Sequence, residues 1–141
     1  MSRVLAFDLG ASSGRAVLAE YAGEKIKYKE IHRFENMPVS ENGTLRWDFD
    51  YLMREIKKGI DLAIDLGGVD SMAFDTWGVD YGLLDDSGKL ISQPFHYRDK
   101  RTERLPQQIF KQMPPEELYS ATGIQTVSYT HLRAHETRGN L

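Results

Sequence analysis

A short polar segment near the start of the chain, Asp8–Arg15, combines residue types that bind phosphate and divalent metals. It reads Asp-Leu-Gly-Ala-Ser-Ser-Gly-Arg, with one carboxylate, two hydroxyls, two glycines and one guanidinium. Glycines let backbone N–H groups approach an anion, and hydroxyls and a guanidinium donate to phosphate oxygens. A carboxylate can hold Mg²⁺ directly or through water. The segment therefore predicts a site for metal-bound phosphate.

Two common phosphate-binding motifs do not describe this segment. It lacks the Gly-Lys-Ser/Thr of a P-loop and the glycine spacing of a dinucleotide fingerprint, and a strand rather than a helix is expected after it. The residues alone leave a second interpretation open, namely a plain β-hairpin turn that is rich in small polar residues.

The sequence around the segment predicts strands on both sides of a tight turn. Apolar runs at residues 3–8 and 16–21 are separated by the six residues 9–14, and a third run starts at Ile26. The apolar positions of the third run change phase at Ile31, which suits a β-bulge. Three adjoining antiparallel strands are the simplest arrangement.

A helix is the clearest element that the pattern predicts. Apolar residues recur at helical spacing from Leu52 to Ile64. Asp48 or Asp50 can cap its N-terminus, and Gly67-Gly68 can end it.

The rest of the chain predicts a buried strand, a hairpin and two further helices. The strand is Val69–Phe74, and it leads into the polar sequence Asp75–Gly78. A turn is expected at Asn42-Gly43, with a short extended piece at 45–47, a hairpin with strands 81–84 and 89–91, and helices at 102–113 and 115–121. This order suits an α/β fold, a mixed sheet covered by helices, with functional residues at strand ends.

Composition argues against several classes of function. The 141 residues include 18 basic and 21 acidic side chains, a net charge of −3, and no cysteine, so disulfides and thiolate metal sites are excluded. There is no basic stripe for nucleic acid. No apolar run reaches the roughly 18 residues of a membrane span, and the N-terminus lacks the apolar region of a signal peptide. We expect a cytoplasmic domain that binds neither nucleic acid nor membrane.

The C-terminal stretch differs from the rest of the chain. From Val127 it reads Val-Ser-Tyr-Thr-His-Leu-Arg-Ala-His-Glu-Thr, which resembles the translation of a transposase adapter used in sequencing libraries. We therefore predict a natural domain at residues 1–126 and a non-native tail at 127–141. The natural chain is expected to be the N-terminal part of a longer protein.

The segment Asp8–Arg15 resembles the first phosphate loop of the sugar-kinase, actin and Hsp70 superfold. Its sequence Gly-Ala-Ser-Ser-Gly-Arg is similar to that of the rhamnulokinases among the FGGY carbohydrate kinases. Further segments between residues 3 and 125 resemble these kinases in the same order: Glu30–Phe34, Trp47-Asp48, Asp75–Asp80, Tyr97–Asp99, Arg101-Thr102 and Gly123–Gln125. The resemblance implies a ribonuclease H-like, actin-like ATPase fold, present here as the incomplete first domain of a two-domain sugar kinase.

The resemblance also implies site residues. Those that match the ATP-contacting loop are Ala11, Ser12, Ser13, Gly14 and Arg15. Asp8 matches the carboxylate near Mg²⁺ and the γ-phosphate, and Gly78 matches a sugar-binding position. A glycine at a strand end lets backbone groups lie against a polyol.

Aromatic and cationic residues extend the expected sugar site. Trp77 and Tyr97 can offer aromatic faces to the sugar's C–H surface, and Arg98 can reach its hydroxyls. For both aromatics the alternative is a place in the hydrophobic core. His32 and His96 have no partner visible in the sequence, so we expect them to be structural or exposed.

The implied activity is transfer of the γ-phosphoryl group of ATP to the 1-hydroxyl of L-rhamnulose in rhamnose catabolism, with Mg²⁺ offsetting phosphate charge. In the resembled family the catalytic base and the adenine-binding residues lie beyond residue 126, so no catalytic residue is assigned in this chain. Two alternatives remain: another FGGY kinase acting on a ketose or polyol, and a non-enzymatic actin-like or chaperone-like nucleotide switch. Asp75–Asp80 favours rhamnulose, and the switch would not explain Tyr97–Asp99.

Overall fold

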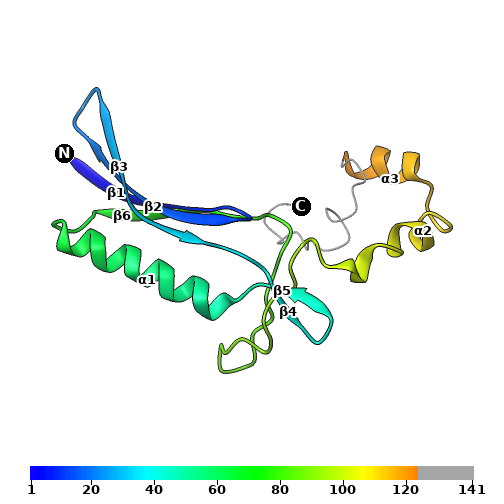
Figure 1. Cartoon of the computed structure of the whole chain (residues 1–141). Coiled ribbons are helices and arrows are strands. Elements are labelled where there is room, and N and C mark those ends of the chain that lie inside the picture. The colour runs from blue at the N-terminus through cyan, green and yellow to red at the C-terminus, as the bar shows by residue number, and fades with distance from the viewer. Residues whose placement is uncertain (124–141) are drawn as a thin grey trace. The chain divides into compact units, whose positions relative to one another are not determined.

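A computed structural model describes residues 1–123 of the chain (Figure 1). The predicted tail at 127–141 lies outside the described residues, as does most of the segment Gly123–Gln125. The chain divides into two compact units, which are described separately. The first unit is Met1–Met37 with Asp48–Trp77, and the second is Pro38–Trp47 with the chain from Gly78 onward.

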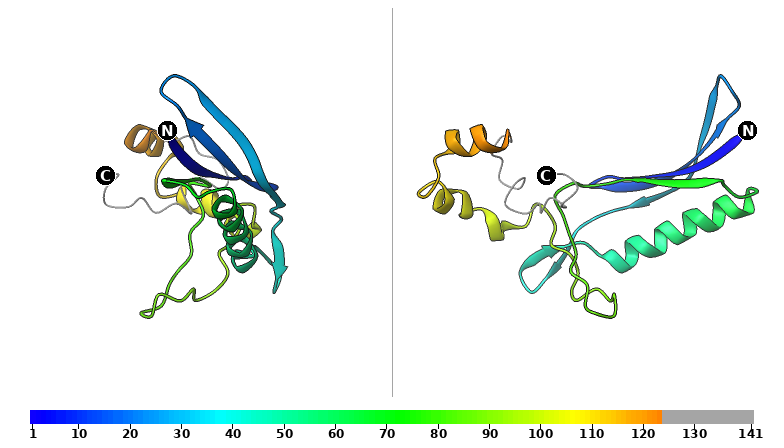
Figure 2. Two further views of the ribbon diagram at one scale, coloured as in Figure 1. Left: turned by 90° about the vertical axis from the view of Figure 1, so that its left-hand side faces the viewer. Right: turned by 180° about the vertical axis from the view of Figure 1, so that it is seen from behind.

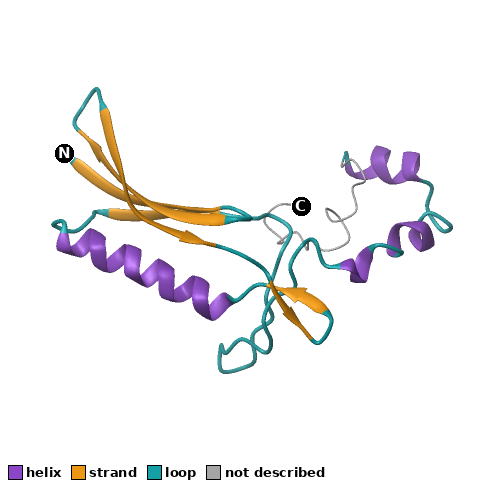
Figure 3. Ribbon diagram, in the orientation of Figure 1, coloured by secondary structure: helices purple, strands orange, loops and turns teal. Residues whose placement is uncertain are grey.

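The first unit is built on a four-stranded mixed sheet (Figure 3). Its strands are β1 (Ser2–Leu9), β2 (Ser13–Tyr21), β3 (Ile26–Glu35) and β6 (Ser71–Asp75), in the spatial order β3-β2-β1-β6. The first three strands form an antiparallel meander, and β6 pairs in parallel with β1. The predicted mixed sheet and its three adjoining antiparallel strands are confirmed.

The pairing of β2 with β3 contains the predicted irregularity. Ala16 pairs with His32, while the next residue, Val17, pairs with Glu30. Ile31 is therefore the extra residue of a β-bulge, at the position where the apolar pattern changes phase.

Helix α1 (Phe49–Asp65) covers one face of this sheet (Figure 2). Of the two candidate caps it is Asp48 that serves, because its carboxylate accepts a hydrogen bond of 2.8 Å from the backbone N–H of Tyr51. The helix ends before Gly67 and Gly68, whose φ angles of 104° and 77° reverse the chain.

The core lies between α1 and the sheet. Its buried residues alternate along β1 and recur at helical spacing on α1: Leu5, Phe7, Leu9, Ala16, Phe34, Leu52, Ile56 and Ala63. Phe7 also stacks on Phe74 of β6, with 5.0 Å between ring centroids. All five residues of β6 are nevertheless exposed, so the predicted strand forms but the prediction that it is buried is wrong. A Cβ on Gly59 of α1 would lie 2.8 Å from the Phe7 ring, so this glycine permits the close approach of helix and sheet.

The second unit contains a small hairpin of β4 (Val39–Glu41) and β5 (Thr44–Arg46). Its two-residue turn is Asn42-Gly43, with φ angles of 50° and 76°. Positive φ at both positions is the geometry of a type I′ turn, which follows the twist of paired strands. The predicted turn is confirmed, whereas the paired strand before it was not anticipated.

The hairpin expected with strands at 81–84 and 89–91 is mostly turn. Only a single bridge, Leu84 with Leu90, joins the two segments, and Asp85 closes the turn through its backbone N–H to the carbonyl of Lys89. The prediction of two strands is wrong here. Most apolar side chains of these segments, Tyr81, Leu83, Leu84 and Ile91, are exposed, so burial does little to stabilise a longer ladder.

The helix expected at 102–113 is also wrong in its extent. The chain forms a 3₁₀ turn, η1 (Lys100–Thr102), and a short helix α2 (Leu105–Ile109). Pro106 explains the break, because proline is tolerated in the first turn of a helix and not in its interior. Helix α3 (Pro115–Thr122) forms as predicted. Across residues 1–123, none of the helices has the length and apolarity needed to cross a membrane.

Candidate functional site

The polar segment Asp8–Arg15 forms the tight turn between β1 and β2. The two strands pair up to Leu9 and Gly14, and the N–H of Gly10 donates to the carbonyl of Ser13 at 2.9 Å. The ladder therefore fixes both ends of the turn and leaves Ala11 and Ser12 at its tip. Both interpretations of the segment require a turn of this kind.

The ladder places the predicted metal ligand beside the predicted phosphate-binding cation. Asp8 and Arg15 are opposite each other in the antiparallel pair. The Arg15 Nε donates to Asp8 Oδ2 at 2.8 Å, and Nη2 donates to the same oxygen. Both side chains are almost half exposed, so an incoming phosphate or cation can reach either of them.

A second carboxylate, which the sequence analysis did not assign, lies next to Asp8. In the parallel pairing of β1 with β6, Asp8 is in register with Asp75 and Phe7 with Phe74. Neighbouring residues of a strand point to opposite faces, so the two carboxylates share the face opposite to the phenylalanine stack. The signal was present, because both aspartates end apolar runs and the carboxyl ends of parallel strands meet at one edge.

This donor set fits a magnesium ion bound together with phosphate. Mg²⁺ prefers hard oxygen ligands, and it commonly takes one or two carboxylates while phosphates and water complete its shell. In the part of the chain that the structure describes, three or more metal-binding side chains do not cluster anywhere. A cation at Asp8 would therefore take its remaining ligands from nucleotide and solvent.

Gly14 has a packing role that its sequence context did not reveal. A Cβ on this residue would lie 2.2 Å from the ring of Phe34, so any side chain here would force that ring to move. The absence of a side chain lets Phe34 of β3 pack across β2 into the core. The predicted contact of Gly14 with ATP stays a prediction beside this structural reason.

Asn36, directly after β3, also contacts the turn and was not singled out from the sequence. It is 4% exposed, and it hydrogen-bonds to the carbonyls of Gly10 and Ser12. The sequence could not indicate this contact, because an asparagine at a strand end points to a partner only when the fold that brings the two together is known.

The predicted sugar-site residues fall into both units. Trp77 is the last residue of the first unit, where it packs against the core and is partly buried. A place in the hydrophobic core, the alternative to a sugar contact, therefore accounts for part of this side chain. Gly78, Tyr97 and Arg98 belong to the second unit. A Cβ on Gly78 would meet no atom within 4 Å, so this glycine has an open side.

Tyr97 and Arg98 lie in an aromatic cluster of the second unit. The ring of Tyr97 stacks on that of His96 at 4.5 Å, and the guanidinium of Arg98 lies 5.1 Å from the Tyr97 ring centroid. His96 is completely buried and packs against Trp47 at 4.1 Å between ring centroids. Of the two predicted possibilities, structural or exposed, the burial of His96 excludes the exposed one.

A carboxylate that the sequence analysis did not assign anchors this cluster. Asp80 Oδ2 accepts hydrogen bonds from Trp47 Nε1 at 2.6 Å and from the backbone N–H of Tyr97 at 3.1 Å. Asp99 does the same for the neighbouring segment, because its buried carboxylate accepts from the N–H of Leu45 at 2.8 Å. Carboxylates therefore add to the backbone pairing of this region, which is a single bridge between Arg46 and Phe95.

His32 contacts the buried carboxylate of Glu55 in the first unit. Its Nε2 lies 2.8 Å from an oxygen of Glu55 on α1, and the other oxygen of Glu55 accepts from Lys58 at 2.6 Å. The hydrogen bond from Lys58 lowers the pKa of Glu55 below its ordinary value, with help from His32, although burial acts in the opposite direction.

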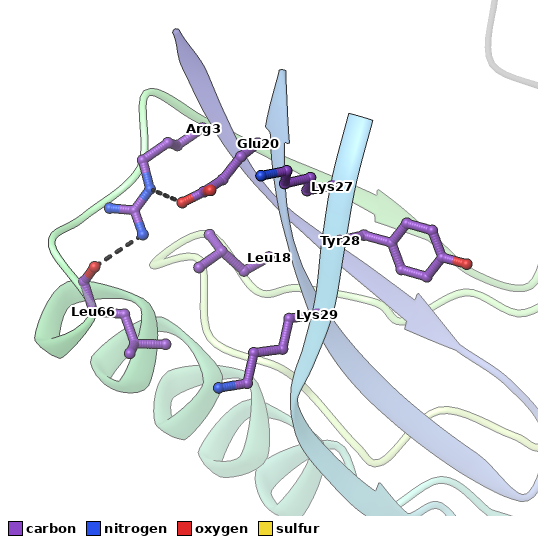
Figure 4. Close-up of a pocket in the computed structure, with 7 residues that line it drawn as sticks. All are labelled: Arg3, Leu18, Glu20, Lys27, Tyr28, Lys29 and Leu66. Atoms are coloured by element: carbon purple, nitrogen blue, oxygen red, sulfur yellow. Dashed lines mark hydrogen bonds and ion pairs between the residues drawn. The ribbon is translucent and has the colours of Figure 1, made fainter. Parts of the chain in front are cut away.

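A cavity of about 250 Å³ lies away from these residues (Figure 4). Its lining joins β2 and β3 to the end of α1: Arg3, Leu18, Glu20, Lys27, Tyr28, Lys29 and Leu66. Arg3 pairs with Glu20 at 3.1 Å and donates to the carbonyl of Leu66 at 2.9 Å. The polar atoms of Arg3 therefore secure the C-terminus of α1.

Comparison with known proteins identifies the class. Residues 3–134 match the sequence profile described as "FGGY family of carbohydrate kinases, N-terminal domain". The chain belongs to this family. It is 44% identical over 132 residues to the rhamnulokinase of Mannheimia succiniciproducens and 40% identical over 133 residues to that of Lactiplantibacillus plantarum. These alignments cover 92% and 94% of the chain and 27% of each relative, so the chain spans about a quarter of their length.

Solved structures of two kinases from Lactobacillus acidophilus share the fold. The xylulose kinase gives a TM-score of 0.67 at 12% identity and the gluconate kinase 0.69 at 14% identity. The matches cover 85% and 86% of this chain and 24% and 25% of the two structures. The predicted fold class, a mixed sheet with flanking helices in part of a sugar-kinase domain, is thereby confirmed.

Proposed function

We propose that the protein carrying this chain is an ATP-dependent sugar kinase that phosphorylates the 1-hydroxyl of L-rhamnulose in rhamnose catabolism. Family membership supports the reaction class, and the identity to two rhamnulokinases supports the sugar. The observation that carries the proposal is the β1–β2 turn, where Asp8 pairs with Arg15 at the carboxyl end of β1, the strand that runs parallel to β6.

Each residue of the turn has a proposed task in phosphoryl transfer. The residues that contact ATP are Ala11, Ser12, Ser13, Gly14 and Arg15. Asp8 holds Mg²⁺, which when bound offsets the negative charge of the phosphates. Arg15 leaves Asp8 for a phosphate oxygen, which it can do without loss because a guanidinium pairs with phosphate as well as with carboxylate. Such positioning and electrostatics account for most of the catalysis of phosphoryl transfer.

The proposed sugar contacts come from the segment after β6 and from the aromatic cluster. Gly78 offers backbone groups on its open side. Trp77 and Tyr97 present ring faces to the C–H surface of the sugar, while Arg98 donates to its hydroxyls. Polar groups of this kind in small number fix the orientation of a bound ligand.

The test is a sugar-dependent ATPase assay on the full-length protein with L-rhamnulose, D-xylulose, gluconate and glycerol. We expect the highest kcat/KM with L-rhamnulose and a product phosphorylated at the 1-position. A higher value with another sugar would assign the protein to a different FGGY kinase. ATP turnover that ignores every sugar would contradict the kinase proposal and favour a nucleotide switch.

We further propose that residues 1–126 are part of an N-terminal kinase domain and that 127–141 are a non-native tail of a soluble, cytoplasmic protein. The adapter-like sequence of the tail supports this division. The family match continues to residue 134, so the boundary of the native domain could lie after residue 126 or after residue 134, and truncation distinguishes the two. Chains truncated after residue 126 and after residue 134 are expected to melt at the temperature of the full 141 residues. A lower melting temperature for the shorter chain alone would place residues 127–134 in the native domain.

The 141-residue chain by itself is expected to phosphorylate no sugar, because the proposed base and adenine pocket lie elsewhere in the protein. Formation of L-rhamnulose 1-phosphate by the purified chain, at a rate near that of the full-length enzyme, would contradict this.

A further inference from the structure

We propose that Asn36 is a positioning residue for the phosphate turn, acting through the backbone of residues 10–13 rather than by touching substrate. The inference rests on the proposed function of that turn. Asn36 is the first residue after β3, whose last residue is Glu35, and it is 4% exposed. Its polar groups therefore face protein rather than solvent.

The side-chain nitrogen and the backbone nitrogen of Asn36 each donate a hydrogen bond to the same turn. The side-chain Nδ2 donates to the carbonyl of Gly10 at 2.7 Å, and the backbone N–H donates to the carbonyl of Ser12 at 3.0 Å. The turn itself supplies a third bond, from the N–H of Gly10 to the carbonyl of Ser13 at 2.9 Å. Donors from the protein thus hold the carbonyl oxygens of residues 10, 12 and 13.

The electrostatic consequence concerns phosphate. A carbonyl oxygen that faces an anion repels it, whereas backbone N–H groups and hydroxyls attract it. Asn36 keeps the carbonyls of Gly10 and Ser12 turned toward the end of β3. The N–H groups and hydroxyls of the turn are then the groups left to face a phosphate. Preorganised dipoles of this kind need not rotate when a charged ligand arrives.

The location of Asn36 argues for a role beyond general stability. The strand ladder secures the base of the turn through Leu9 and Gly14, but it does not reach Ala11 or Ser12. Asn36 spans 26 positions in sequence to reach Gly10, and it joins the turn to β3, a strand that does not pair with β1. The β2–β3 ladder reaches Ser13 through Glu35, so the bond from the Asn36 side chain extends the support from β3 to Gly10 at the other end of the turn.

The experiment compares Asn36→Ala and Asn36→Asp with Glu55→Gln in the full-length protein. Glu55 is an equally buried polar residue of the same unit, and its partners His32 and Lys58 are not part of the turn. Asn36→Asp keeps the size and the backbone bond to Ser12 while replacing the Nδ2 donor by a charged acceptor, so hydrogen exchange of the turn, rather than the KM, is the deciding readout if Asn36→Ala fails to fold.

We expect both Asn36 variants to raise the KM for MgATP about tenfold, equivalent to about 1.4 kcal/mol, with the sugar KM within twofold of wild type. Glu55→Gln is expected to lower the melting temperature without changing either KM. Equal KM values for MgATP in wild type and both Asn36 variants, at a lowered melting temperature, would overturn the proposal.

A second readout separates this inference from the proposed function. Amide hydrogen exchange of residues 10–13 without any nucleotide is expected to speed up at least severalfold in Asn36→Asp and to stay at the wild-type rate in Glu55→Gln. This result holds even if the wild-type protein phosphorylates no sugar. Unchanged exchange in Asn36→Asp means that the side chain does not hold the turn, and the proposal is then wrong.

Discussion

The phosphate turn in the first unit and the segment from Gly78 to Arg98 in the second unit are held in different ways. The turn closes an antiparallel pair whose ladder runs without interruption from Ser2 to Leu9 on β1. The later segment contains no strand longer than a single bridge. Its backbone is tied at a few isolated points: Phe95 forms a single bridge with Arg46 of β5, and Asp80 accepts a hydrogen bond from the N–H of Tyr97.

The difference teaches where each kind of site gets its precision. Ladder hydrogen bonds join backbone groups and do not depend on the identity of the side chains. The turn can therefore carry functional side chains while the ladder fixes its base. A segment held by side-chain bonds depends on a few polar residues, and each of these costs stability when its partner is removed. We expect substitutions in the turn to change chemistry or packing sharply, and those in the later segment to change ligand recognition.

The largest expected effect is that of Asp8→Asn in the full-length protein. The amide keeps the size of the side chain and removes the charge that is proposed to hold Mg²⁺ against the transferring phosphoryl group. We expect kcat to fall about 100-fold or more, with the sugar KM little changed, as for loss of one electrostatic stabiliser. Steady-state kinetics and a thermal melt on the same preparation measure both quantities.

Asp85→Asn is the matched control for this charge removal. Its carboxylate accepts bonds from Ser87 and Lys89 inside a turn of the second unit, so kcat is expected to stay at the wild-type value. An unchanged kcat in Asp8→Asn with a lowered melting temperature would show that Asp8 is only a turn residue.

The second prediction compares two glycines. Gly14→Ala puts a Cβ 2.2 Å from the Phe34 ring, while Gly78→Ala meets nothing within 4 Å. We expect Gly14→Ala to lower the free energy of unfolding by about 2 kcal/mol, the usual cost of overpacking, and Gly78→Ala to leave it unchanged. Urea titration measures both, and Phe34→Leu should recover part of the loss in the double variant.

The same Gly78→Ala variant tests the sugar site. If backbone groups at Gly78 lie against the sugar, an added methyl group crowds that surface and raises the sugar KM about tenfold, at constant stability. Sugar kinetics identical to wild type would remove Gly78 from the proposed site.

Trp47→Phe probes the side-chain bonds of the second unit. The substitution keeps an aromatic ring and removes the indole N–H that donates to Asp80 at 2.6 Å. We expect a loss of about 1–2 kcal/mol in the free energy of unfolding, as for one buried hydrogen bond to a charged acceptor. A phenylalanine variant as stable as wild type would mean that Asp80 does not need this donor.

The smallest expected effect is a pH dependence of stability that comes from Glu55. Because its pKa is lowered in the folded protein from 4.5, its carboxylate contributes full stability above that value and loses it as the pH falls through the folded pKa. The stability advantage of wild type over Glu55→Gln is expected to be about 1 kcal/mol near pH 5 and smaller near pH 3. Urea titrations at both values check this, and an advantage that grows on acidification contradicts it.

Local patterns predicted the elements whose causes are local. The bulge at Ile31, the cap at Asp48 and the stop at Gly67 follow from apolar phase, a side-chain oxygen and a positive φ, and each needs only its neighbours. The helix predicted at 102–113 is too long, because Pro106 is compatible only with the first turn of a helix and α2 starts there. The paired strands predicted at 81–84 and 89–91 are reduced to a single bridge. Most of their apolar side chains are exposed, so little burial stabilises the pairing.

The sequence by itself thus determined the turn at Asp8–Arg15, its chemical character and the family to which it belongs. Only the tertiary structure decided that Asp75 stands in register with Asp8, that Asn36 donates a hydrogen bond to Gly10 and that Asp80 accepts hydrogen bonds from Trp47 and Tyr97. The physical reason is that strand order and long-range hydrogen bonds depend on the burial of the whole sheet and its core. Their partners lie tens of residues apart, beyond the few residues over which helical and strand periodicity operate.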